Sequence, residues 1–140
     1  MAHSKPGEGL HLIADAYVGE GLDQKKTVRR FIKAAVASTG GHEQKPLHLR
    51  NLDIRLFPNG YLPWWKRMIH WPRPITGFGP GVTANGTLSE SHITLHTRPE
   101  CGYINFDLFS CRSFNVEHIR KIVDNYFGVK RWTKWEVMER

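Results

Sequence analysis

The chain has 140 residues, 40% of them hydrophobic and 24% charged, so it can form a hydrophobic core without a metal or disulfides. Its net charge of +7 favours anionic partners, but the basic residues are spread along the whole chain, which argues against nucleic acid as the main ligand. Two cysteines are too few for a disulfide scaffold or a regular zinc site, and no apolar run is long enough to span a membrane. We expect a single domain over residues 1–140, in a cytoplasmic protein with no membrane span and no metal.

The first half of the chain predicts a strand, a helix and another strand. Residues 10–17 alternate so that leucine and alanine share one face, which is typical of a strand with one buried side. Residues 22–41 have apolar side chains at helical spacing, with Asp23 in an N-cap position and two glycines at the end. Residues 47–57 alternate again and predict a second strand.

The segment that follows differs in composition from the predicted strands and helix before it. Residues 58–82 contain five prolines and three tryptophans but no acidic residue, which predicts a loop, with 58–80 as an inserted loop or lid. Two further strands are expected at 91–97 and 103–111, joined by a turn that contains proline and glycine.

This predicted hairpin has an apolar face and a polar face. Matching apolar residues across its two strands places Leu95 opposite Ile104 and Ile93 opposite Phe106. The polar face then carries side chains from both strands: His92, Thr94 and His96, with Tyr103, Asn105 and Asp107. In most hairpins such a face is simply in contact with solvent.

A second helix is predicted at 115–128, with Asn115 as its cap, and a last strand within 129–140. The order of strands and helices predicts an α+β fold. In this two-layer sandwich an antiparallel sheet carries the helices on one face.

The ends of the hairpin add reactive side chains to the polar face. Ser91 begins the first strand, His96 lies within it, and Cys111 ends the second strand. Together they supply a nucleophile, a proton carrier and a second acid. A serine hydrolase does not fit, because no G-x-S-x-G motif surrounds Ser91.

The same stretch resembles a known family. SESHITLHTRPE, followed by GYINFDLFSC, is similar to the motif E-S-H-[ILV]-[ST]-[ILV]-H-T-x-P-E, then G-Y and D-x-F-[ST]-C, of the prokaryotic S-adenosylmethionine decarboxylases. The spacing from Ser91 to Cys111 agrees without a gap, and weaker similarity covers most of the chain except 58–80. The resemblance implies the fold of that family and a pyruvoyl-dependent decarboxylase, which produces the aminopropyl donor for spermidine synthesis.

The resemblance implies that the chain is a zymogen which makes its own cofactor. Cleavage between Glu90 and Ser91 would give chains 1–90 and 91–140. The Ser91 hydroxyl attacks the Glu90 carbonyl and converts the amide into an ester, and elimination and hydrolysis then leave a pyruvoyl group in place of the serine. A strained turn before the strand would favour this step.

Other residues acquire roles by the same resemblance. His96 matches the family's processing histidine, and Thr83 a hydroxyl residue of the same step. Cys111 matches the acid that reprotonates the substrate's α-carbon after CO2 has left. Glu100 matches the glutamate that hydrogen-bonds the ribose hydroxyls of the substrate. Family members build the active site between protomers, which implies a homodimer of cleaved chain pairs.

The sequence offers more than one candidate for each remaining substrate contact. The family stacks the substrate adenine on an aromatic ring, for which Phe57 and Phe78 are both candidates. Arg98 stands where bacterial members commonly have tryptophan, and an arginine can either stack on adenine or pair with a substrate carboxylate. A pyruvoyl-dependent arginine or ornithine decarboxylase is therefore an alternative.

Two further alternatives come from other classes of protein. One is a non-enzymatic relative that binds a nucleoside or a partner protein through the tryptophan-rich segment. The other is a metal site made of His92, His96 and Cys111.

Overall fold

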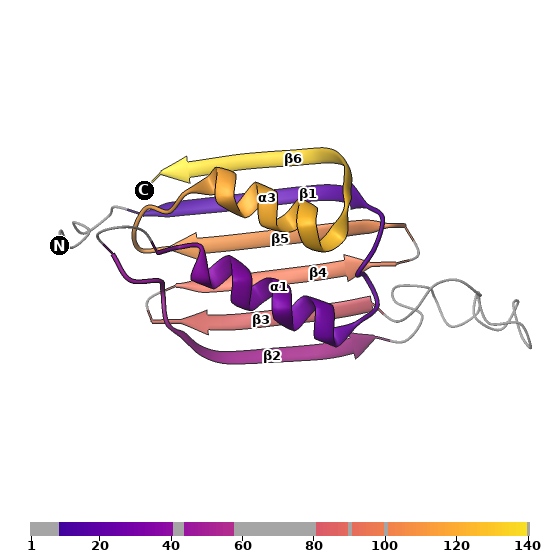
Figure 1. Ribbon diagram of the computed structural model, residues 1–140, viewed down its shortest axis with the longest axis horizontal. Helices are drawn as coiled ribbons and strands as arrows, with labels where there is room; N and C mark the ends of the chain where they lie inside the picture. Colours follow the sequence, from indigo (N-terminus) through magenta and orange to yellow (C-terminus); the bar gives the residue numbers. More distant parts are fainter. Residues whose placement is uncertain (1–8, 41–43, 58–80, 90, 100, 140) are drawn as a thin grey trace, which may run out of the picture.

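The computed structural model describes residues 9–40, 44–57, 81–89, 91–99 and 101–139. They form a six-stranded antiparallel sheet with two helices on one face (Figure 1), which confirms the predicted α+β fold. The elements in chain order are β1 (Leu10–Val18), α1 (Lys25–Ala37), β2 (Leu49–Phe57), β3 (Gly81–Leu88), β4 (His92–Arg98), β5 (Tyr103–Ser110), α3 (Val116–Phe127) and β6 (Val129–Glu139). The strand order across the sheet is β2-β3-β4-β5-β1-β6. The predicted insertion at 58–80 lies outside the described residues.

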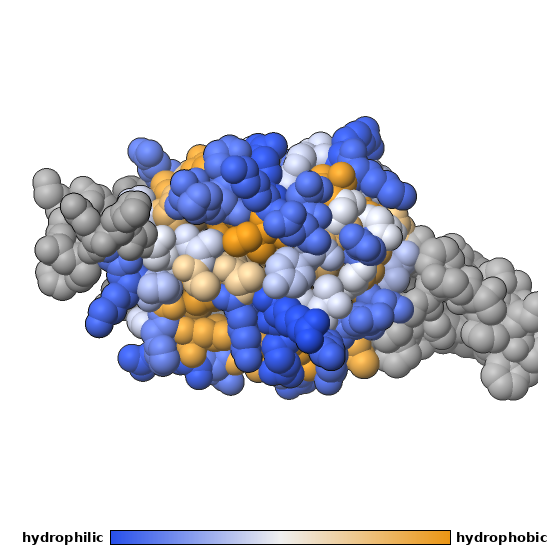
Figure 2. All heavy atoms as spheres, in the orientation of Figure 1, coloured by the Kyte–Doolittle hydropathy of each residue, from blue (hydrophilic) through white to orange (hydrophobic). Residues whose placement is uncertain are grey.

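The hydrophobic core lies between the two helices and one face of the sheet. Every second residue of β1, β4 and β5 is buried, because successive strand side chains point to opposite faces. Phe31 of α1 is fully buried, with its ring 5.3 Å from that of Phe106 in the sheet and 5.0 Å from that of Phe127 in α3. Figure 2 views this side and shows that hydrophilic side chains cover most of the helices' outer surface. No helix among the described residues covers the other face of the sheet, which is called the open face below.

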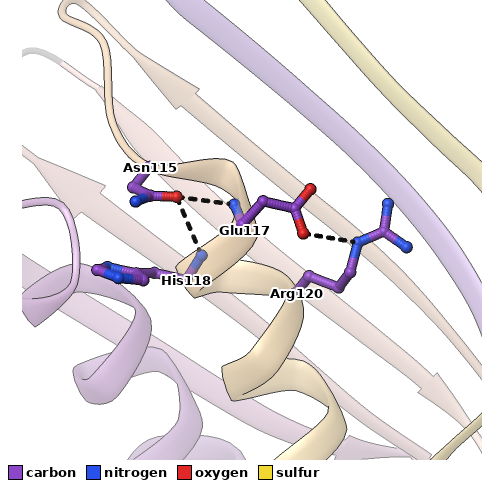
Figure 3. A network of polar contacts seen from close by, with 4 residues as sticks. All are labelled: Asn115, Glu117, His118 and Arg120. Carbon is purple, nitrogen blue, oxygen red and sulfur yellow. Dashed lines mark hydrogen bonds and ion pairs between the residues drawn. The ribbon is translucent and has the colours of Figure 1, made fainter.

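Helix α3 begins and ends as the sequence predicts. The side chain of Asn115 accepts hydrogen bonds from the backbone N–H groups of Glu117 at 3.0 Å and His118 at 3.2 Å (Figure 3). These bonds satisfy two donors that have no partner within the helix. At the other end Gly128 has a φ of 61°, a left-handed conformation that glycine adopts without strain.

The start of α1 differs from the prediction. Asp23 is not the N-cap: Gln24 occupies that position, and it makes no side-chain capping bond. The helix also ends at Ala37, before the two glycines. Helix α1 therefore depends on its buried face, which includes Phe31 and Ile32, more than on a cap.

The sequence analysis missed β3, which begins within the segment assigned to a loop. GVTANGTL has weak strand propensity because it contains two glycines and an asparagine. The strand is nevertheless central, paired with β2 on one side and β4 on the other. A Cβ atom on Gly86 would lie 2.7 Å from Cγ2 of Ile93, so packing against β4 requires glycine here.

The predicted register of the β4–β5 hairpin was wrong by two residues. Leu95 lies opposite Phe106, not Ile104, and Ile93 lies opposite Leu108. The strands extend to the pair Arg98 and Tyr103, which leaves a four-residue turn that ends at Gly102 with a φ of 64°. A shift of two residues keeps every side chain on its predicted face, so the division into apolar and polar faces is unchanged.

Candidate functional site

The residues that the sequence analysis singled out lie in two groups at opposite ends of β4. The first group lies where β4 starts and β5 ends (Figure 1). The second group lies near the end of β4 and the start of β3, at the opposite end of these strands.

At the first end, Ser91 is held by the chain on both sides. Its carbonyl accepts a hydrogen bond from the N–H of Leu88 at 2.9 Å, which closes the β3–β4 turn. Its hydroxyl oxygen accepts a hydrogen bond from the N–H of Cys111 at 3.0 Å. Ser91 is only 8% exposed, and Cys111 is half-buried. The structure therefore places the predicted nucleophile beside the backbone of Cys111, which is twenty residues away in sequence.

At the second end, Thr83 and His96 form a side-chain pair. They lie directly opposite each other on β3 and β4, and Thr83 Oγ1 is 2.6 Å from His96 Nδ1. Both are half-buried and out of phase with the core residues of their strands, so both belong to the open face. A hydrogen bond at Nδ1 fixes the orientation of the imidazole ring.

The two ends do not meet within one chain. Ser91 and His96 are five residues apart along an extended segment, so their backbones are separated by ~16 Å. The two side chains also lie on different faces of the sheet. Ser91 is buried like the core residues Ile93 and Leu95, whereas His96 lies on the open face. One copy of the chain thus presents the pairs Ser91–Cys111 and Thr83–His96 as separate halves of the predicted site.

Between these ends the open face contains polar pairs that the sequence analysis did not assign. His11 Nε2 contacts Asp107 Oδ1 from the neighbouring strand. Asn105 donates to Asp15 Oδ1 at 2.9 Å. The alternation of β1 placed these histidine and aspartate side chains on its polar face, but only the pairing of β1 with β5 identifies their partners. No local sequence signal indicates that pairing, because the two strands are not consecutive.

Aromatic rings extend this face next to Ser91. The ring of His92 stacks on Phe109 with a centroid distance of 5.4 Å and an interplanar angle of 15°. The ring of His11 meets the same phenylalanine edge-on at 5.6 Å. The polar face predicted for the hairpin is therefore partly an aromatic surface.

The predicted substrate-binding residues are only partly described. Arg98 is exposed at the end of β4 and lies opposite Tyr103. Phe57 ends β2, where its backbone pairs with that of Gly81. Glu90, Glu100 and Phe78 lie outside the described residues.

Within the described ranges, no three histidine, cysteine, aspartate or glutamate side chains are grouped so that they could hold a metal ion. His92, His96 and Cys111 all fall in these ranges, so the alternative metal site is not supported. Among the same residues, no helix has the length and apolar character needed to cross a membrane.

Comparison with known sequences finds a family model and relatives that share one description. A family model described as S-adenosylmethionine decarboxylase matches residues 74–140. An S-adenosylmethionine decarboxylase proenzyme from Thermomicrobium roseum is 31% identical over 103 residues, which cover 74% of this chain and 67% of the relative. A proenzyme of the same description from Thermosipho melanesiensis is 32% identical over 105 residues, 74% of this chain and 61% of the relative. About a third or more of these relatives' length thus lies outside the alignments.

Comparison with solved structures gives the same fold. The crystal structure of the adenosylmethionine decarboxylase from Aquifex aeolicus superposes with a TM-score of 0.64 at 21% identity. The superposition covers 96% of this chain and 91% of that one. At this identity the likeness establishes the architecture of the sheet and helices alone.

Proposed function

Because the chain belongs to the S-adenosylmethionine decarboxylase family, whose named relatives are proenzymes, we propose that it cleaves itself and then decarboxylates S-adenosylmethionine. The observation that carries the proposal is the placement of Ser91: a buried hydroxyl at the start of β4, bonded to the backbone of Cys111. These residue types suit the making and use of a pyruvoyl group. The expected products are chains 1–90 and 91–140.

The self-cleavage step uses the chain's own atoms. Ser91 Oγ attacks the carbonyl carbon of Glu90, the C–N bond breaks, and an ester and a free amine replace the amide. Removal of the Ser91 α-proton then expels the Glu90 carboxylate and leaves a carbon–carbon double bond on the new N-terminus. One water molecule hydrolyses the tautomer of this product, releases ammonia and leaves the pyruvoyl ketone. The low exposure of Ser91 supports this order, because it limits attack of bulk water on the ester.

In decarboxylation a pyruvoyl ketone supplies the electron sink for the carbanion that forms when CO2 leaves. Cys111 is the residue that returns a proton to the α-carbon. Its backbone N–H donates to Ser91 Oγ, so Cys111 lies beside the residue whose carbon atoms become the pyruvoyl group. Substrate binding falls to Glu100 for the ribose and to Phe57 or Phe78 for the adenine, as the family resemblance implies.

The distance between the two halves of the site supports a homodimer. His96 is ~16 Å along the strand from Ser91 in the same chain, too far for direct proton transfer. Among the described residues no helix covers the open face, so a second copy can pack there and bring its own Thr83–His96 pair to the end of β4 at which Ser91 and Cys111 lie. In this arrangement each of two sites takes its nucleophile from one chain and its proton carrier from the other.

The second candidate function is a decarboxylase for arginine or ornithine on the same scaffold, because Arg98 stands exposed where bacterial members of the family commonly have tryptophan. Release of labelled CO2 from S-adenosylmethionine, arginine and ornithine decides between the two. We expect turnover of S-adenosylmethionine alone.

The experiment that tests self-cleavage is denaturing mass spectrometry of freshly purified protein, with Ser91→Ala as the matched variant. The unaltered chain should give fragments 1–90 and 91–140, the second with the mass of a pyruvoyl group in place of serine. Ser91→Ala should remain a single chain of 140 residues. An uncut, inactive wild-type chain would contradict the proposal.

A further inference from the structure

Thr97 is a fully buried hydroxyl residue that follows His96 in β4 but points toward the core side. Its Oγ1 accepts a hydrogen bond from the N–H of Val82 at 2.8 Å. The same hydroxyl donates to the carbonyl oxygen of Leu22 at 2.5 Å. One side chain therefore joins β4 to β3 and to the connection between β1 and α1.

The position of this hydroxyl matters because of where the β3–β4 ladder ends. The paired residues run from Thr87 and His92 to Thr83 and His96, and no backbone pair follows. Val82 comes directly before Thr83, and its N–H donates to the Thr97 hydroxyl. The side chain of Thr97 thus continues the connection between the strands for one residue beyond the last backbone pair.

That last backbone pair consists of Thr83 and His96, the side chains joined on the open face. A pair at the end of a ladder separates more easily than one within it, unless another bond holds the strands beyond it. We propose that Thr97 is a positioning residue, which keeps Thr83 within hydrogen-bonding distance of His96 Nδ1. The consequence for catalysis rests on the function proposed above, in which His96 transfers protons during self-cleavage.

Removing the hydroxyl affects both of its partners. Thr97→Val keeps the shape and the branched β-carbon, but it leaves the Val82 N–H and the Leu22 carbonyl without their bonds. Strand β3 can then move relative to β4 at this end, and the Thr83–His96 distance lengthens. Displacements of ~1 Å at a catalytic group reduce rates by up to about 100-fold.

The chain offers a close control in Thr39. It is 1% exposed, its hydroxyl donates to the Val36 carbonyl at 2.6 Å, and it accepts from the Leu47 N–H at 2.9 Å. It thus has the same burial and the same two kinds of backbone partner as Thr97, but it lies in the connection between α1 and β2. Thr39→Val should destabilise the protein to a similar extent without contacting the Thr83–His96 pair.

The test compares Thr97→Val, Thr97→Ser and Thr39→Val by cleavage rate and by thermal unfolding. We expect Thr97→Val to cleave more slowly by between 10- and about 100-fold. Thr97→Ser, which keeps the hydroxyl, should restore most of the rate, and Thr39→Val should lose stability yet cleave normally. Equal cleavage rates for Thr97→Val and the wild type would overturn the proposal, and so would equal slowing by Thr39→Val.

A second measurement separates this inference from the proposed function. In a Ser91→Ala background, where no cleavage is expected, the ring-nitrogen NMR signals of His96 report the bond at Nδ1. Adding Thr97→Val should shift the Nδ1 signal toward that of a weaker hydrogen bond, whereas Thr97→Ser and Thr39→Val should not. An unchanged signal would overturn the positioning role. A wild-type chain that never cleaves would instead refute the proposed function, while these spectra would still decide the role of Thr97.

Discussion

The two ends of β4 hold their reactive groups in different ways. At the Ser91 end, a buried hydroxyl bonds to the backbone of Cys111, so main-chain geometry fixes its place. At the His96 end, two half-buried side chains bond to each other on the open face. Residues that are close in a sequence motif are therefore far apart in the fold, because a strand rises about 3.3 Å per residue and alternates its side chains. This separation is the reason for the proposal above that a complete site takes a part from each of two chains.

The largest expected effect comes from mixing two inactive chains. Ser91→Ala cannot form the ester, and His96→Ala should cleave between 10²- and about 10⁴-fold more slowly because it lacks the proton carrier. In a mixed dimer, one site combines Ser91 of the His96→Ala chain with His96 of the Ser91→Ala chain. We expect rapid cleavage of the His96→Ala chain only, measured by mass spectrometry of differently tagged copies.

A matched control for the mixing experiment pairs His96→Ala with the double variant Ser91→Ala and His96→Ala. No site in that dimer has an intact proton carrier, so cleavage should stay slow. If the His96→Ala chain also remained uncut in verified mixed dimers with Ser91→Ala, the shared site would be wrong and the two ends of β4 would have to act within one chain.

A smaller effect is expected from a change at Cys111, which should slow decarboxylation but not self-cleavage. Cys111→Ala keeps the backbone N–H that donates to Ser91 Oγ, so self-cleavage should continue. Decarboxylation should fall between 10²- and about 10⁴-fold, because the thiol that returns the proton is missing. Cys101→Ala removes the other free cysteine, which is exposed in the β4–β5 turn, and should leave both rates unchanged. Equal turnover by Cys111→Ala and Cys101→Ala would exclude the thiol as the acid.

The smallest effect is expected away from both ends, at the cap of α3. Asn115→Ala removes the bonds to the N–H groups of Glu117 and His118 and should lower the free energy of unfolding by about 1 kcal/mol. Asn125→Ala changes an exposed residue within the same helix and should not destabilise it. Chemical denaturation measures both variants, and neither should alter cleavage. Slower cleavage by Asn115→Ala would mean that the helix layer influences the open face.

Much of the fold could be predicted because its signals are local. Alternation in β1, β4 and β5 and helical spacing in α1 and α3 depend on neighbouring residues, and so does the Asn115 cap. Strand β3 was missed because its stability comes from β2 and β4 on either side and from close packing at Gly86, which no propensity records.

The candidate site divides in the same way. The spacing of Ser91, His96 and Cys111 was enough to indicate the family and the kind of chemistry, since a motif is a property of the chain's order. The partners of these residues were not predictable: Ser91 with Cys111, Thr83 with His96, and Thr97 with Val82 and Leu22. Each of these contacts joins segments distant in sequence, and the pairing of strands decides which of them meet. By itself the sequence determined which reactive groups the protein carries, and only the tertiary structure decided that they form two separate pairs.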